Sequence, residues 1–178
     1  MQPQTKDNNL KVITKTFLAM ALILITSGAA FAETVFNAQG STLIPSVVSR
    51  YRDSASSEWT VIKLSNITNQ AIQCNVIVYD HNGNEVITGM RIESGASGGI
   101  GTVVSSGTGL FEIPAHSTRY YQLGSGNSVH TIYGYAVVEW KSDDPQQRKA
   151  LIGGVEKSRV SGNNVLKGEV LINNGQPF

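Results

Sequence analysis

The residue types that carry out chemistry in enzymes are few in this sequence and lie far apart. The three histidines, His81, His116 and His130, form no H-x₃₋₅-H or H-E-x-x-H zinc motif. Ser, His and Asp residues occur, but no G-x-S-x-G motif presents a nucleophilic serine. A catalytic triad would have to be assembled by the fold, because triads are defined by geometry. The sequence therefore favours a protein that is not an enzyme, with no catalytic residue, no metal ligand and no cofactor.

Residues 80–85, Asp-His-Asn-Gly-Asn-Glu, carry side-chain oxygens at alternating positions, as the start of a calcium loop does. A twelve-residue calcium loop ends on a bidentate Glu, and Arg91 stands at that position. The Asn-Gly pair at 82–83 explains the segment without a metal, because both central positions of a type I′ turn need a positive φ. We expect a hairpin turn here, between strands at 71–80 and 85–92.

The segment 94–109 is the richest in glycine, with six glycines in sixteen residues. It matches neither G-x-G-x-x-G nor a phosphate-binding loop, which needs a Lys. One interpretation is a long flexible connection. The other is a flap whose ordered part, Thr102, Val103 and Val104, contacts a partner by pairing along a strand edge.

Aromatic residues suggest a second binding surface. Strict alternation at 131–141 predicts a strand with Tyr133 and Tyr135 on one face. Exposed rings on a sheet can form a flat platform for a sugar, although Tyr is also an ordinary residue of half-buried strands. The opposite face of this strand carries the residues expected in the core: Ile132, Ala136, Val138 and Trp140.

Residues 1–32 have the three parts of a secretory signal peptide. Basic residues precede an apolar run at 17–25, and Ala30 and Ala32 form an A-x-A cleavage site. The run is about half the ~20 apolar residues that a membrane span requires. The sequence therefore predicts cleavage after Ala32 and a secreted or periplasmic protein without a stable membrane span.

The next ten residues, 33–42, are expected to form a flexible N-terminal arm. Val35 and Phe36 within it could add to the sheet of a neighbouring molecule, as donor strands do. The domain proper is expected to span 43–178, a usual size for a single domain.

Charge and cysteine content argue against a nucleic-acid-binding protein and against a domain stabilised by disulfides. The formal net charge is +1, and without basic clusters there is no electrostatic signature of a nucleic-acid-binding protein. Cys74 is the single cysteine, so no intrachain disulfide can form. It alternates with Ile72, Val76 and Val78, which predicts a buried and unreactive thiol on the apolar face of a strand.

Short β-rich runs separated by Gly, Asn, Ser and Asp recur along the chain, and no stretch shows helical periodicity. This pattern predicts an all-β protein, a single antiparallel β-sandwich of about eight or nine strands. A second hairpin turn is expected at 161–164. The predicted strands are 43–51, 59–67, 71–80, 85–92, 109–113, 117–123, 131–141, 150–160 and 165–173.

Four segments occur in an order that resembles a known class. They are the strand at 59–68, the strand end Tyr-Asp at 79–80, the Asn-Gly turn at 82–83 and the run Phe-Glu-Ile-Pro-Ala-His-Ser-Thr at 111–118. Over 59–138 the chain is similar to bacterial immunoglobulin-like β-sandwich domains, including the sensory rhodopsin transducer family. The resemblance implies a sandwich fold and transfers no site and no partner.

Three functions remain open from the sequence. The first is an exported, non-catalytic structural or protein-interaction domain of the cell envelope or extracellular space, associating with itself or with an envelope protein. The second is a module that binds a carbohydrate or small ligand through Tyr133 and Tyr135 or through the glycine-rich segment. The third is a small secreted hydrolase whose triad only the fold assembles.

Overall fold

The computed structural model describes residues 36–98, 101–124 and 128–178. The chain divides into Met1–Phe36 and a unit Asn37–Phe178, and the fold below is that of the second unit. The predicted signal peptide and Val35 lie outside the described residues. Within the described ranges, no helix is both long and apolar enough to cross a membrane.

The described residues form ten β-strands and a single turn of 3₁₀-helix, so the all-β prediction is confirmed. The elements are β1 (Gly40–Asp53), β2 (Ser56–Asn66), β3 (Ile72–Asp80), β4 (Met90–Ser94), β5 (Thr102–Ser106), β6 (Leu110–Ile113), β7 (Thr118–Leu123), β8 (His130–Lys141), β9 (Leu151–Ser161), β10 (Asn164–Leu171) and η1 (Ile172–Gly175).

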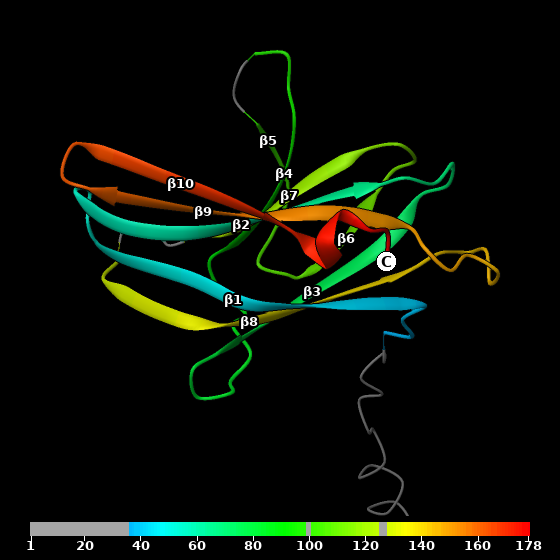
Figure 1. Cartoon of the computed structure of the whole chain (residues 1–178), viewed down its shortest axis with the longest axis horizontal. Coiled ribbons are helices and arrows are strands. Elements are labelled where there is room, and N and C mark those ends of the chain that lie inside the picture. Colours follow the sequence, from blue (N-terminus) through cyan, green and yellow to red (C-terminus); the bar gives the residue numbers. More distant parts are fainter. Residues whose placement is uncertain (1–35, 99–100, 125–127) are drawn as a thin grey trace, which may run out of the picture. The chain divides into compact units, whose positions relative to one another are not determined.

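All ten strands belong to one antiparallel sheet, which curls until it nearly closes into a barrel (Figure 1). The order along the sheet is β5-β4-β7-β2-β1-β8-β3-β6, and β9 pairs with β2 while β10 pairs with β9. The hydrogen bonds therefore connect every strand, and they do not separate the chain into the two independent sheets expected from the sequence.

One strand, β2, connects the two halves of the sheet. Its residues 56–66 pair with β9 along one edge. The other edge is shared, because 56–59 pair with β1 and 60–65 pair with β7. The strands β1 and β7 therefore diverge between Trp59 and Thr60, and the inner faces of the two halves enclose the space between them.

A buried hydroxyl occupies this point of divergence. Thr60 is fully buried, and its Oγ1 accepts a hydrogen bond from the Val48 amide at 2.9 Å and donates one to the Val48 carbonyl at 3.0 Å. The pairing of β1 with β2 ends at Ser49, so the preceding residue, Val48, has no backbone partner on β2. The threonine side chain replaces that partner, so a buried backbone amide and carbonyl remain satisfied.

Alternate residues of the strands point into the enclosed space and form one core. Trp140 and Tyr121 are its largest fully buried side chains. The faces predicted for 131–141 are confirmed, since Ala136 and Val138 are fully buried and Ile132 packs against the core. Other members, contributed from β1, β2, β3, β6 and β9, include Ile44, Ile62, Leu64, Ile72, Val76, Ile113 and Leu151.

The turn at 80–84 differs from the predicted one. Gly83 alone has a positive φ, of 81°, so the turn is not type I′. The Asp80 carbonyl accepts from the Gly83 amide at 3.1 Å. The Asp80 carboxylate accepts from the amides of Asn82 and Asn84 at 2.8 and 2.9 Å. Asp80 therefore organises the turn, and its side-chain oxygens are used by amides.

The predicted hairpin between 71–80 and 85–92 is also wrong. After the turn the chain makes one antiparallel bridge, Tyr79 with Glu85. It then leaves β3, and β4 pairs with β7 and β5 in the other half of the sheet. The hairpin predicted at 161–164 is confirmed, with Gly162 at a φ of 60° in its two-residue loop.

The N-terminal boundary of the domain also shifts. Strand β1 begins at Gly40 and pairs with β8 from that residue onward. Residues 40–42, which the sequence assigned to a flexible arm, therefore lie in the sheet. The strand predicted from Leu43 therefore begins three residues earlier.

The burial of Cys74 makes its thiol inert in the folded state. The residue is fully buried and has no disulfide partner, and burial raises the pKa of the thiol to about 12. Because the thiolate is the reacting species, alkylation of the native protein should be slow and should become fast in denaturant. Mass spectrometry of timed iodoacetamide reactions measures both rates. Equal rates in the two conditions would contradict the burial.

Removal of the Thr60 hydroxyl should destabilise the fold without changing its shape. Thr60→Val leaves the buried Val48 amide and carbonyl without a partner, so the free energy of unfolding should fall by about 1–3 kcal/mol. The same change at exposed Thr131 of β8 is the control and should stay within about 0.5 kcal/mol. Urea unfolding of both variants measures the difference. A loss at Thr60 no larger than at Thr131 would show that the hydroxyl is dispensable.

Candidate functional site

The strand edges that lack a neighbouring strand differ in regularity in the described part of the sheet. Strand β6 is four residues long, and β5 has five residues and an irregular register. The free edge of β1 is interrupted at Pro45 by a β-bulge. Such short, bulged or proline-containing edges resist pairing with another molecule. Strand β10 has none of these features, since eight residues pair with β9 in continuous register.

Strand β10 is also exposed along its whole length. It carries apolar side chains on both faces, with Val165 58 %, Leu166 60 %, Val170 72 % and Leu171 61 % exposed. In Figure 1 it forms the outer margin of this part of the sheet, beside β9. A regular free edge flanked by exposed apolar residues is a template for strand addition.

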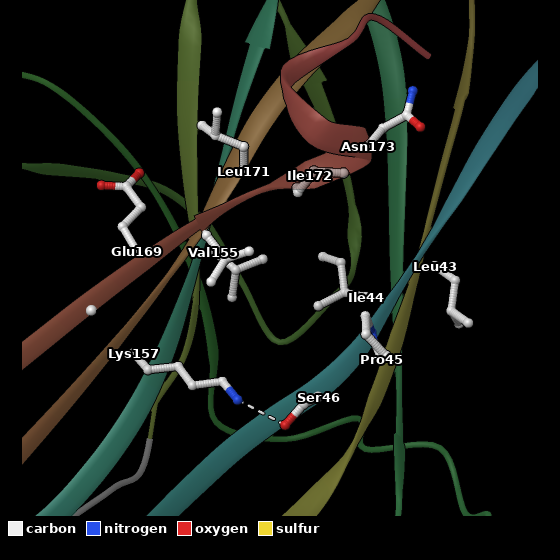
Figure 2. A pocket seen from close by; sticks show the side chains of 12 residues that line it. Leu43, Ile44, Pro45, Ser46, Val155, Lys157, Glu169, Leu171, Ile172 and Asn173 are labelled. Atoms are coloured by element: carbon white, nitrogen blue, oxygen red, sulfur yellow. Dashed lines mark hydrogen bonds between the residues drawn. The ribbon is translucent and has the colours of Figure 1, made fainter.

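An apolar groove lies under the inner face of β10. It has a volume of about 450 Å³ and separates β10 and β9 from the N-terminal part of β1 (Figure 2). The Lys157 side chain spans it, and its ammonium donates a hydrogen bond to the Ser46 hydroxyl at 2.7 Å. The apolar residues that line it are Leu43, Ile44, Pro45, Val155, Val170, Leu171 and Ile172.

The outer face of the same strands carries a network of charges. The Lys63 ammonium lies 2.9 Å from the Glu156 carboxylate and 3.1 Å from that of Glu169. The Lys167 ammonium lies 3.0 Å from Glu156. The two glutamates are directly opposite each other on β9 and β10, so the two lysines neutralise a pair of carboxylates that would otherwise repel.

These contacts shift the pKa values of the central pair. Hydrogen bonds from Lys63 and then Lys167 lower the pKa of Glu156 to about 2. The pKa of Lys63 is raised, first by Glu156, although partial burial opposes the shift. Glycine at 154 permits the arrangement, because a Cβ there would lie 2.8 Å from Glu169 Oε1. Glu169 can therefore reach across β9 to Lys63 on β2.

The two tyrosines singled out by the sequence lie on the outer face of β8. Tyr133 is 51 % and Tyr135 39 % exposed. The ring of Tyr135 stacks on Tyr79 of β3, with centroids 5.1 Å apart and planes at 26°. One face of Tyr135 is therefore covered, and Tyr133 is the more accessible of the two rings.

The remaining predicted contact residues do not join these surfaces. Thr102, Val103 and Val104 lie in β5, at the end of the sheet order, where all three are exposed. They form an edge strand hydrogen-bonded to β4, as the flap interpretation expected of its ordered part. Phe36 precedes β1, and Val35 is outside the described residues.

The edge at β10 was not among the predicted contact residues, although the sequence carries a signal for it. Residues 165–171 read Val-Leu-Lys-Gly-Glu-Val-Leu, so apolar residues stand next to each other and point to opposite faces of the strand. A half-buried strand alternates instead. In the described ranges no three His, Cys, Asp or Glu side chains cluster as metal ligands.

Comparison with known proteins assigns no family. No family model matches the chain, and no curated protein is similar to it. Its fold is weakly similar to the crystal structure of Thermotoga maritima 1070, with a TM-score of 0.49 and 10 % sequence identity over 79 % of this chain and 100 % of that one. A similarity of this strength supports no inference about function.

The ion pairs of Glu156 should make stability depend on pH in a defined window. Its pKa falls from 4.5 to about 2 on folding, so its contribution is complete above 4.5 and is lost as the pH approaches 2. Glu156→Gln should lower the melting temperature at neutral pH, and the difference from wild type should shrink across this window. Glu112→Gln, at an exposed carboxylate of β6, is the control. Parallel pH profiles for wild type and Glu156→Gln would contradict the prediction.

Proposed function

We propose that this protein is an exported, non-catalytic interaction domain of the cell envelope or extracellular space, and that it binds a protein partner by strand addition at β10. The observation that carries the proposal is the free edge of β10, eight residues in regular register with apolar side chains exposed on both faces. Export is taken from the predicted signal peptide at 1–32.

Strand addition uses the free backbone groups of β10 and the apolar surface beside them. Main-chain hydrogen bonds to an added strand supply affinity, and pockets for alternate side chains supply specificity. At β10 the added strand would find backbone groups along the edge and the apolar groove beside Val170 and Ile172. The edges of β6, β5 and β1 are short, irregular or interrupted by proline, so β10 is better suited than these three.

The sandwich predicted from the sequence is retained as part of the proposal in a modified form. The two halves that diverge at Thr60 act as the two layers, with their inner faces sharing one core. In this description the immunoglobulin-like arrangement is a scaffold that leaves one margin, at β10, open for a partner.

The outer face of β8 favours a second candidate, a carbohydrate-binding module. Tyr133 is half exposed and Tyr135 stacks on Tyr79, so aromatic surface is concentrated at one place on the sheet. Sugar rings pack on such surfaces through their C–H faces. This site lies on β8 and β3, away from β10, and the two candidates can be tested separately.

The experiment compares two pairs of substitutions in cells that export the protein. Leu166→Asp with Val170→Asp places charge on the inner face of β10, and Val103→Asp with Val104→Asp is the matched control on β5. Chemical crosslinking should give protein adducts with wild type and with the β5 variant, and none with the β10 variant. Melting curves of the purified variants confirm that each is folded.

Two outcomes would reject the proposal. Adducts that persist in the folded β10 variant would place the binding surface elsewhere. Absence of adducts from all forms, combined with glycan binding that Tyr133→Ala abolishes, would favour the carbohydrate-binding module instead.

A further inference from the structure

The sequence of β10 is self-complementary about its central glycine. On either side of Gly168 stand a charged residue and then two apolar residues, in the order Val-Leu-Lys-Gly-Glu-Val-Leu. The charge is positive on one side, at Lys167, and negative on the other, at Glu169. Reversing the direction of the strand therefore brings each lysine opposite a glutamate and each apolar residue opposite another.

We propose that the partner at β10 is a second copy of this chain, whose β10 pairs antiparallel with the first about a two-fold axis at Gly168. The inference rests on the proposed function, since it names the partner of the same edge. A two-fold axis makes the contact isologous, so one self-complementary surface is sufficient to form a closed dimer.

The register follows from the two-fold axis. Lys167 faces Glu169 of the second copy, and Glu169 faces the second copy's Lys167. Val165 faces Leu171 and Leu166 faces Val170 in the same way. Because directly opposite residues point to the same side of a sheet, the charges meet on the outer face. Leu166 and Val170 meet on the inner face, over the groove that Val170 lines.

The free backbone groups of β10 agree with this register. The loop of the β9–β10 hairpin has two residues, so Ser161 and Asn164 form its closing hydrogen-bonded pair. Alternation then directs the amide and carbonyl groups of Val165, Lys167, Glu169 and Leu171 away from β9. Across the proposed axis, these four residues form the hydrogen-bonded pairs. The Leu166–Val170 pairs lie in the non-hydrogen-bonded positions between them.

The existing charge network continues across the axis. Within one copy, the Lys63 ammonium contacts both Glu156 and Glu169, and the Lys167 ammonium contacts Glu156. In the dimer a second lysine, Lys167 of the other copy, approaches Glu169 from the opposite side. The result is a charge network over six strands, β2, β9 and β10 of each copy, in which Glu156 and Glu169 each contact two lysines.

Charge reversal tests the register. The protein is expressed from the full-length sequence and purified in the form that the cell exports. Lys167→Glu and Glu169→Lys each place like charges opposite each other twice about the axis. Each should weaken the dimer about tenfold or more, as measured by sedimentation equilibrium. The double variant Lys167→Glu, Glu169→Lys restores opposite charges and should restore the dimer. Melting curves show whether each variant is folded.

A backbone variant covers the case in which the charge variants fail to fold. Glu169→Pro removes an amide that points away from β9, so the hairpin can persist while the edge loses a donor. It should be a folded monomer. Restoration in the double variant, or a monomer with the proline, supports the proposal.

Three results would overturn it. They are a wild type that is monomeric at every concentration, a dimer insensitive to both single reversals and to the proline, and a dimer lost on deleting residues 33–39 alone. The failures are distinguishable, because a monomeric wild type that still gives β10-dependent adducts with another protein would reject the second copy and leave the proposed function standing.

Discussion

Two strands, β1 and β7, share one edge of β2, and the rest of the architecture depends on the point where one replaces the other. A strand has two edges, and β9 occupies one of them over the full length of β2. On the other edge β1 is replaced by β7 at Thr60. This exchange would leave the backbone of Val48 buried and unpaired, which costs free energy comparable to a lost hydrogen bond. The Thr60 hydroxyl supplies the missing partner with two hydrogen bonds, so the sheet can open without a buried polar group left unsatisfied.

The divergence has consequences on both sides of the sheet. On the inside, the two halves face each other and bury one apolar core that includes Trp140, Tyr121 and Cys74. The single cysteine precludes an intrachain disulfide, so this core and the backbone ladder supply the stability. On the outside, β9 follows β2 beyond the point where β1 turns away. Strand β10, which pairs with β9, therefore faces an apolar groove on its inner side, whereas the inner sides of the core strands face buried side chains.

The electrostatic contacts fix β10 in place even though it contributes no buried residue. Lys63 on β2 contacts Glu169 on β10 across the glycine at 154, and Lys167 contacts Glu156 on β9. These pairs are partly exposed, and pairs of this kind contribute little stability individually. They add to the backbone pairing that holds this eight-residue strand in register against β9, with its outer edge open and its apolar side chains exposed. A strand that is already paired along one edge loses less conformational entropy than a free segment when another strand binds.

The sequence by itself determined what depends on neighbouring residues. Short β-rich runs predicted eight of the ten strands and overlapped β4 only at 90–92, alternation predicted the buried face of 131–141, and the position of Cys74 on an apolar face predicted its burial. The two-residue turn at 162–163 was predicted because glycine and asparagine there suit a tight hairpin. Local patterns gave β5 only as the ordered part of one of two interpretations, because its glycine-rich surroundings mask the strand propensity of Val103 and Val104, and they misplaced the partner of β4. Only the tertiary structure decided which strands pair, because pairing depends on contacts between distant segments that no local pattern encodes. For the same reason, only the fold could leave one edge of β10 without a neighbouring strand and so make its exposed apolar residues the candidate site.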